Sequence, residues 1–170
     1  AANNVAVGVN ALLANTTGTS NVAVGANALD ANTTGGNNIG IGQSALGAAT
    51  TAGNNVAVGA NAGQRITTGA NNVLLGYLSG EYTTTGGYNC GMGLYSLRNN
   101  TTGGSNVALG TSALLANTTG GSNVSVGYGS LTANTTASNN TAVGYNSLGA
   151  NTTGTDNTGA GAGALQSNTT

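Results

Sequence analysis

Hydrophobic and polar residues recur along this chain with a period of 17 residues. In the repeat 21–37, NVAVGANALDANTTGGN, residues 21–25 alternate as a β-strand does, with Val22 and Val24 on one face and Ala23 on the other. The position of Val24 is apolar in all ten repeats, so we expect Val22 and Val24 to lie in the core and Ala23 to point outward. Such a short and strict period predicts a solenoid, in which each coil packs on its neighbours.

Asparagine and glycine hold two invariant positions of the repeat, and we call the residues at one position of successive repeats a column. The asparagine column is Asn4, Asn21, Asn38, Asn55, Asn72, Asn89, Asn106, Asn123, Asn140 and Asn157, and the glycine column is Gly8, Gly25, Gly42, Gly59, Gly76, Gly93, Gly110, Gly127, Gly144 and Gly161. Stacked parallel strands bring identical residues about 4.8 Å apart, so we expect the asparagines to form a ladder of side-chain amides. The glycines lack a Cβ atom and are expected to turn the chain with a positive φ. These two columns are explained by structure and need no ligand.

The second half of each repeat supplies a further apolar column and a pair of threonines. Leucine fills this column in eight repeats, as at Leu29, and glycine replaces it at Gly63 and Gly80. We expect the leucines to form the second half of the core and the threonine pairs, such as 33–34, to form a second short strand. The sequence thus predicts an all-β fold, a parallel β-solenoid or β-roll of ten 17-residue coils with two short strands each, in one repeat array over residues 1–170.

Charged residues are almost absent, and their absence excludes several classes of function. The complete set is Arg65, Arg98, Asp30, Glu81 and Asp156, with no lysine and no histidine. The chain therefore lacks the basic surface that neutralises nucleic-acid phosphates, and it has no run of about 20 apolar residues that would span a membrane. No two carboxylates share a repeat, and no acidic column exists for calcium. We therefore predict no enzymatic activity, no metal site and no cofactor.

Several segments resemble the repeats of two known families. The segments NNVAVGVNAL (3–12), SNVAVGANAL (20–29), NNVAVGANAG (54–63) and SNVALGTSAL (105–114) resemble the head repeat of YadA-type trimeric autotransporter adhesins, which has an N-S-V-A-I-G core followed by small residues. The segment NTTASNNTAVGYNSL (134–148) is similar to the NTTG-SNNTAVGY arrays of phage and prophage tail-fibre-like proteins. The adhesin resemblance implies a left-handed parallel β-roll, three chains side by side and display on a cell surface, although the adhesin repeat is shorter than the repeat of this chain.

Taken together, these patterns predict a structural protein that assembles with copies of itself. Each repeat offers few large apolar side chains for the number of residues it orders, so we expect a second face to be buried against other chains. The small alanine column, with Ala6, Ala23, Ala57 and Ala108, is expected to allow this close approach in a homotrimer. Neither end of the array carries the proline or charge that blunts an open β edge, which predicts head-to-tail continuation in a longer fibre or a filament. The expected function is the shaft of an extracellular fibre, a surface appendage or a phage tail fibre, located on a cell surface or a virion.

The middle repeats differ most from the others and indicate an alternative function, an adhesin-type module that binds a receptor or a glycan. Tyrosine and arginine are the side chains that most often anchor recognition surfaces. The candidate binding patch is Arg65, Tyr77, Tyr82, Tyr88, Tyr95 and Arg98. Glu81 and Arg98 occupy one column on successive coils, so we expect them to pair across one rung. Drift within a redundant array would explain the same substitutions without a ligand.

Asparagine-threonine-threonine triplets recur in one column and match the N-x-S/T pattern of N-glycosylation acceptors. The candidate glycosylation sites are Asn15, Asn32, Asn100, Asn117, Asn134, Asn151 and Asn168. If these side chains were modified, the coils would carry a row of sugars along one edge.

Two further columns bear on the surface of the solenoid. Tyr128 and Tyr145 follow the invariant glycine on consecutive coils, in a column that also accepts Val9 and Ala26, so we expect them at the surface with their rings about 4.5–7 Å apart. The threonine pairs raise ice binding as a third and less favoured function. Adjacent threonines on a strand point to opposite faces, so each pair would offer only one outward hydroxyl.

Overall fold

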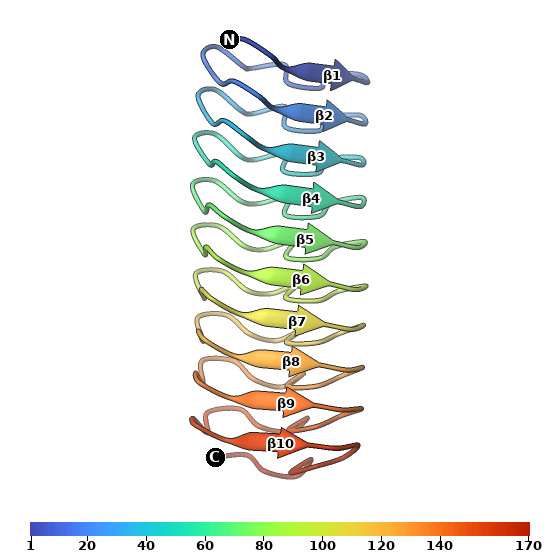
Figure 1. Cartoon of the computed structure of the whole chain (residues 1–170), viewed down its shortest axis with the longest axis vertical. Helices are drawn as coiled ribbons and strands as arrows, with labels where there is room; N and C mark the ends of the chain where they lie inside the picture. The colour runs from blue at the N-terminus through green and yellow to red at the C-terminus, as the bar shows by residue number, and fades with distance from the viewer.

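The computed structural model describes residues 1–170 as one elongated β-solenoid without a helix (Figure 1). The chain runs along the strand in the foreground, returns behind it and descends by one coil, so the winding is left-handed (Figure 1). We number the coils from the asparagine that opens each of them, so coil 1 starts at Asn4 and coil 10 at Asn157. The strands are β1 (Val5–Val7), β2 (Val22–Val24), β3 (Ile39–Ile41), β4 (Val56–Val58), β5 (Val73–Leu75), β6 (Cys90–Met92), β7 (Val107–Leu109), β8 (Val124–Val126), β9 (Thr141–Val143) and β10 (Thr158–Ala160).

All ten strands form one parallel sheet in sequence order, which confirms the predicted all-β solenoid. Residues one repeat apart lie opposite each other, as Val22 and Ile39 do between β2 and β3. A one-residue slip would turn every side chain to the other face, and a repeat without insertions prevents such a slip. Every sequence column is therefore a straight file of side chains parallel to the solenoid axis.

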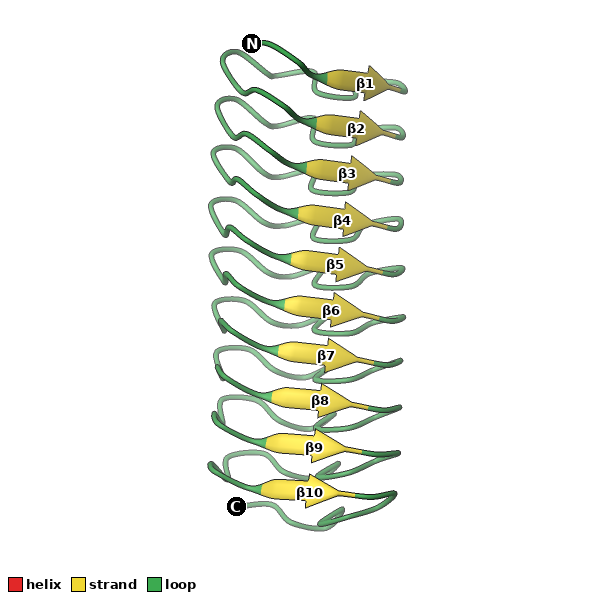
Figure 2. Ribbon diagram, viewed as in Figure 1, coloured by secondary structure: helices red, strands yellow, loops and turns green.

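Each coil contains one strand of three residues, so the prediction of two strands per coil is wrong. Figure 2 shows that the return half of every coil consists of turns and loops. Leu29 has a left-handed backbone with a φ of 51°, and its equivalents share this conformation, so the chain bends before it reaches the threonines. Thr16 and Thr17 then both donate their backbone N–H to the carbonyl oxygen of Thr33, at 3.0 Å each. This shared acceptor replaces the even spacing of a parallel β ladder.

The inside and the outside of each strand are the reverse of what we predicted. Ala23 is fully buried, whereas Val24 is partly exposed and Val58 is 37% exposed. Alternation shows that the two faces of a strand differ, but it does not show which face is inside. The coil interior is narrow, because a Cβ atom on Gly40, in the alanine column, would lie only 3.3 Å from Leu29 Cγ. The alanines that we expected to lie between chains are therefore inside the coil, as at Ala23, Ala57 and Ala108.

The leucine column forms the second half of the core, as predicted. Leu29, Leu46, Leu114 and Leu148 are fully buried and pack with the alanines of the strands. Most coils thus hold one leucine from the return wall and one small residue from the strand wall. The core is continuous along the axis but thin in cross-section.

Coils 4 and 5 fill the same interior in a different way. Gly63 and Gly80 stand in the leucine column, and Leu74 of β5 stands in the alanine column. A Cβ atom on Gly80 would lie 2.7 Å from Leu74 Cδ1, and one on Gly63 would lie 3.0 Å from the same atom. Ile66 occupies part of this space and is fully buried. One leucine on the strand wall, helped by Ile66, therefore replaces two leucines on the return wall.

The asparagine column forms a buried ladder of amides. Asn38 Nδ2 donates to Asn21 Oδ1 at 3.1 Å and to the carbonyl oxygen of Ala52 at 2.8 Å, and the backbone N–H of Asn38 donates to the same Asn21 Oδ1 at 2.9 Å. The bonds between neighbouring amides continue to Asn140. Buried polar groups need partners, and only a side chain of this length that both donates and accepts satisfies the coils on either side. This requirement explains why the column is invariant.

The turn glycines are invariant for a steric reason. Gly25 has a φ of 132°, which side chains rarely tolerate, and a Cβ atom on it would lie 2.6 Å from the carbonyl oxygen of Gly42. The coils approach each other here backbone to backbone. No other residue fits this position while the next coil is in place.

A second ladder, which we did not predict from the sequence, runs through the asparagines that precede the threonine pairs. Asn117 Nδ2 donates to Asn100 Oδ1 at 2.8 Å and to the carbonyl oxygen of Gly120 at 2.9 Å. The ladder is interrupted in coils 3 to 5, where Ala49, Ile66 and Thr83 replace asparagine. Asn32 Oδ1 lies next to this interruption and has no hydrogen-bond partner.

Candidate functional site

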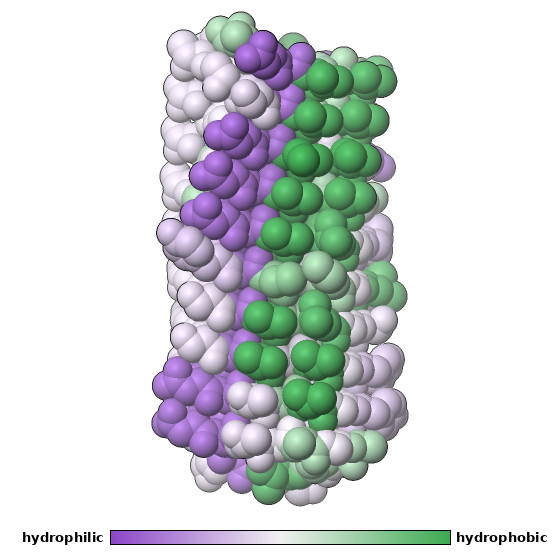
Figure 3. Space-filling view, in the orientation of Figure 1, coloured by the Kyte–Doolittle hydropathy of each residue, from purple (hydrophilic) through white to green (hydrophobic).

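The outward side chains of the strands form a continuous apolar surface, which we call the valine face. Figure 3 shows it as a hydrophobic band along the length of the solenoid. Its side chains are half-buried or exposed, for example Met92 at 39% and Val143 at 43%. The face consists of Val5, Val22, Ile39, Val56, Val73, Cys90, Val107, Val124, Thr141 and Thr158 in one column, and of Val7, Val24, Ile41, Val58, Leu75, Met92, Leu109, Val126, Val143 and Ala160 in the other.

The sequence contains a signal for this surface in the residue types that each column accepts. The columns of the valine face accept cysteine, methionine and threonine, whereas the alanine column holds only alanine, glycine or serine apart from Leu74. A size limit marks the packed interior, and tolerance of larger and polar residues marks the outside. Monomeric soluble proteins rarely expose apolar patches above a few hundred Å², and a band ten rungs long extends over roughly 43 Å. The valine face therefore has the character of an interface.

Five of the six residues of the candidate binding patch come together, and we call them the arginine–tyrosine cluster: Arg65, Tyr77, Tyr82, Tyr95 and Arg98. Arg65 Cζ lies 4.5 Å from the ring centroid of Tyr82, and Arg98 Cζ lies 5.8 Å from the same ring and 5.3 Å from that of Tyr95. The rings of Tyr77 and Tyr95 lie 6.0 Å apart at an angle of 58°. These distances are within the range of cation–π and aromatic contacts, so the cluster is a connected group on coils 4 to 6.

Arg98 and Glu81 form the ion pair that their shared column predicted. Arg98 Nε donates to Glu81 Oε2 at 2.7 Å, and the side chain of Glu81 is only 10% exposed. The hydrogen bond to Glu81 raises the pKa of the Arg98 guanidinium above its usual range, against the opposing effect of partial burial. The pair fixes Arg98 in place beside Tyr82 and Tyr95.

Tyr88, the sixth residue of the candidate patch, does not join the cluster. It lies in the turn that precedes β6, whereas Tyr77 follows the end of β5, and it is 71% exposed. These two turns lie at opposite ends of the coil (Figure 1). Sequence proximity placed Tyr88 in the patch, but the column to which a residue belongs decides its place on a solenoid.

The asparagines of the Asn-Thr-Thr triplets are held inside the coil. Asn100 Nδ2 donates to the carbonyl oxygen of Gly103 at 2.9 Å, and the equivalent amides make the same bond except that of Asn168, which donates to Asn151 Oδ1. N-glycosylation forms a bond at this nitrogen, so the folded coil does not present it to a modifying enzyme. The buried members are Asn32, Asn100, Asn117, Asn134 and Asn151, and the half-buried ones are Asn15 and Asn168. The geometry thus argues against the predicted row of sugars on the folded protein.

The two threonines of each pair face different surroundings. Thr33 Oγ1 donates to the carbonyl oxygen of Thr50 at 3.0 Å, and this bond repeats along the file. Thr34 and its equivalents are exposed. Each pair therefore offers one outward hydroxyl, as expected from the sequence.

Tyr128 and Tyr145 stack on consecutive coils. Their ring centroids lie 5.6 Å apart with an interplanar angle of 13°, and the residues are 56% and 58% exposed. The predicted exposure and spacing of these two rings are both confirmed. The stack supports the 17-residue register independently of the backbone.

Neither a metal site, nor a membrane-spanning helix, nor a similar protein gives a further indication of function. No group of three or more His, Cys, Asp or Glu side chains is arranged to hold a metal ion. No helix is present that could cross a membrane. Comparison with known proteins gives no match, whether with protein-family models, with curated proteins or with solved structures. The surfaces of the solenoid are therefore the basis for any functional proposal.

Proposed function

We propose that this chain is the structural shaft of an extracellular fibre, a surface appendage or a phage tail fibre, in which copies associate through their valine faces as a homotrimer. The observation that carries the proposal is the valine face itself. It bears no charged side chain, it runs the length of the solenoid and it lies on the flat outer surface of a parallel sheet. Burial of apolar surface at about 25 cal/mol per Å² would stabilise such an assembly.

The backbone of the solenoid suits a mechanical role. It contains 118 backbone hydrogen bonds, most of which join neighbouring coils and so point along the axis. The two asparagine ladders add side-chain bonds in the same direction, as between Asn55 and Asn38 at 3.3 Å. Tension along the fibre would be shared by several parallel bonds at every rung. The same rung-to-rung contacts would serve head-to-tail continuation of the shaft.

The mass of the protein in solution tests this proposal. Sedimentation equilibrium should give three times the chain mass of 16.1 kDa. Val58→Glu places a charge in the middle of the valine face and should shift the mass to that of the monomer, because a buried unpaired charge is strongly disfavoured. Val9→Glu makes the same change at a valine that is 71% exposed beyond the turn glycine, and it should leave the mass unchanged. A monomer at all concentrations of the unsubstituted protein would contradict the proposal.

The arginine–tyrosine cluster favours a second candidate function, recognition of a receptor or glycan by the middle coils. Arg65 belongs to no ion pair, since the single salt bridge of the chain joins Arg98 to Glu81. A double substitution, Tyr82→Ala with Arg98→Ala, would separate the two functions. Loss of cell or glycan binding with an unchanged assembly mass would support recognition, and unchanged binding would leave the cluster a structural feature.

A further inference from the structure

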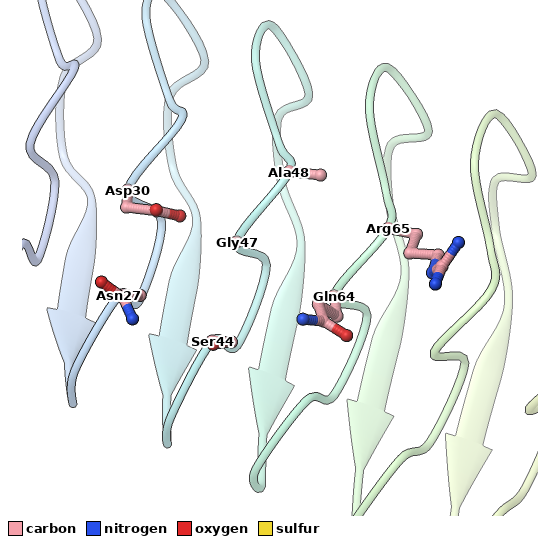
Figure 4. Close-up of a pocket in the computed structure, with 7 residues that line it drawn as sticks. All are labelled: Asn27, Asp30, Ser44, Gly47, Ala48, Gln64 and Arg65. Atoms are coloured by element: carbon pink, nitrogen blue, oxygen red, sulfur yellow. The ribbon is translucent and has the colours of Figure 1, made fainter.

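A shallow groove crosses coils 2 to 4 on the return side of the solenoid, behind the strands. It has a volume of about 480 Å³, and its polar lining comes from Asn27, Asp30, Ser44, Gln64 and Arg65, with Gly47 at the centre (Figure 4). Only one of its lining residues is hydrophobic, so it does not suit an apolar ligand.

The groove exists because glycine interrupts a file of longer side chains. Asp30, Gly47 and Gln64 occupy one column on successive coils, so the middle coil contributes no side chain. A Cβ atom on Gly47 would lie 3.3 Å from Asp30 Oδ1, which shows that the carboxylate of Asp30 reaches over this gap. Figure 4 shows the side chains of Asp30 and Gln64 on either side of Gly47.

The polar side chains around Gly47 have charges and hydrogen-bonding atoms that no other residue of the protein uses. Asp30 forms no ion pair, because the single salt bridge is that between Arg98 and Glu81. The amide of Asn27 uses its Oδ1 to accept a hydrogen bond from Asn10 at 3.0 Å, which leaves its Nδ2 free to donate. A carboxylate and amides on one surface are the groups that bind neighbouring hydroxyls, since together they accept and donate hydrogen bonds.

Arg65 adds a positive charge at the far end of the groove. Its guanidinium extends towards coil 5, away from Gly47 (Figure 4), where it lies 4.5 Å from the ring of Tyr82. This contact orients the guanidinium while its N–H groups stay available for a carboxylate, which arginine binds in a bidentate manner. Asp30 and Arg65 belong to coils two rungs apart, or about 10 Å along the axis, so a ligand that reaches both is of disaccharide length.

We propose that this groove binds an acidic oligosaccharide lengthwise, with hydroxyls of one sugar at Asp30, Asn27 and Gln64 and the carboxylate of the next sugar at Arg65. This inference concerns the return side of the solenoid and does not depend on assembly through the valine face. It names a ligand class and a position for the recognition function. The site also extends the arginine–tyrosine cluster towards coil 2.

The chain carries a matched control for this groove. A second groove of about 320 Å³ lies six repeats further on, around Gly149, and Gln166 lines it as Gln64 lines the first. Thr132 stands in place of Asp30, and Ser167 stands in place of Arg65. The second groove is therefore a smaller version of the first that contains no charged side chain.

Binding of a defined probe tests the proposal. Isothermal titration of the full chain with cellobiouronic acid, in which one of the two sugars carries a carboxylate, should show saturable binding at low salt, with cellobiose as the neutral comparison. Arg65→Gln should weaken binding of the acidic probe by about tenfold or more, since a hydrogen-bonded charge pair is lost. Asp30→Asn should weaken it by a few fold, and Ser167→Ala should leave it unchanged. Circular dichroism would verify that each variant keeps the solenoid fold.

Amide shifts in nitrogen-15 spectra provide the second readout. The acidic probe should move the signals of Gly47 and Gln64 and leave those of Gly149 and Gln166 in place. Absence of binding at tens of millimolar probe would overturn the proposal. The proposal would also be overturned if both probes bound equally, if Arg65→Gln and Ser167→Ala had equal effects, or if the signals of the two grooves shifted equally. Each of these results would show that the charged side chains do not recognise the probe.

Discussion

Coils 4 and 5 and coils 6 to 9 are built on the same backbone but fill their interior from opposite walls. In coils 6 to 9 the return wall supplies leucines, as at Leu97 and Leu114, and the second asparagine ladder is intact. In coils 4 and 5 both features are lost, and Leu74 and Ile66 fill the space instead. The register of the strands is identical in the two regions.

The comparison shows which parts of the repeat are interchangeable. Core volume can move from one wall to the other, because packing depends on total volume more than on which backbone carries it. The second ladder can be interrupted, because its amides join neighbouring coils only through one another, whereas each Oδ1 of the first ladder also accepts the backbone N–H of the next coil, as Asn106 does from Asn123. The first ladder and the turn glycines are never replaced, since each one completes a contact between coils.

The largest effect should come from removing the leucine that fills the interior of coils 4 and 5. Leu74→Ala should lower the free energy of unfolding by about 4 kcal/mol, near the upper end for a buried leucine, because no leucine stands opposite it. Leu114→Ala, in a regular coil, should lower it by about 3 kcal/mol. Urea unfolding followed by circular dichroism would measure both.

A compensating substitution would sharpen this comparison. Gly80→Leu alone should destabilise the protein, because its Cβ atom would lie 2.7 Å from Leu74 Cδ1. Combined with Leu74→Ala it should recover most of the lost stability, because the backbone at Gly80 has a φ of 59°, close to the 52° of Leu114. If the double variant were no more stable than Leu74→Ala, a leucine on the return wall could not replace the leucine on the strand wall, which would contradict this interpretation of the core.

The two ladders should differ in their contribution to stability. Asn106→Ala removes the acceptor of both the backbone N–H and the Nδ2 of Asn123 and should lower the free energy of unfolding by about 3 kcal/mol. Asn134→Ala removes the bonds that its amide donates to Asn117 and Ala137 and the one that it accepts from Asn151, but it leaves no backbone N–H unpaired, so it should cost about 1 kcal/mol, as the interruption in coils 3 to 5 indicates. Thermal unfolding of the two variants would give the ranking, and equal losses would contradict it.

The exposed aromatic stack should make a smaller contribution. Tyr145→Ala removes the partner of Tyr128 and should cost about 1 kcal/mol at most, since both rings are largely in solvent. Tyr88→Ala, at an exposed tyrosine without a stacked partner, is the matched control and should have almost no effect on the midpoint of urea unfolding. A loss as large from Tyr88→Ala would show that stacking is not the cause.

The smallest effect is expected from the ion pair between Glu81 and Arg98. Glu81→Gln should change stability by no more than about 1 kcal/mol, because Arg98 is one-third exposed and solvent screens the pair. Folding raises the pKa of Arg98, so its stabilising contribution is present at neutral pH and is lost only as the pH rises through the folded-state value. The difference between wild type and Glu81→Gln should therefore stay constant from pH 6 to pH 9 in urea titrations.

The sequence predicted which residues stack on one another along the solenoid better than it predicted which stacks face the interior. The period gave the register, the amide ladder and the Tyr128–Tyr145 stack, because in-register stacking follows from repetition alone. It could not orient the strand, since alternation is symmetric and both Val24 and Ala23 are apolar. The orientation could be read instead from the size limit of the alanine column, because the narrow interior of the coil imposes that limit.

The candidate sites were also predicted only in part from the sequence. The pairing of Glu81 with Arg98 could be predicted because the two residues share a column. The groove around Gly47 could not, because it depends on which neighbouring files point towards the gap. Tyr88 was misplaced because closeness in sequence says little about position around a coil.

The central claim, that the valine face is covered by other copies of the chain, is tested most directly by the reactivity of Cys90. This is the single cysteine of the chain, it is half-buried, and it lies in the middle of the valine face. The rate of its reaction with a soluble disulfide reagent should be low in the native protein and should rise at least tenfold in Val58→Glu, where association is lost. Equally fast reaction in both proteins would show that the face is open to solvent and would contradict the account.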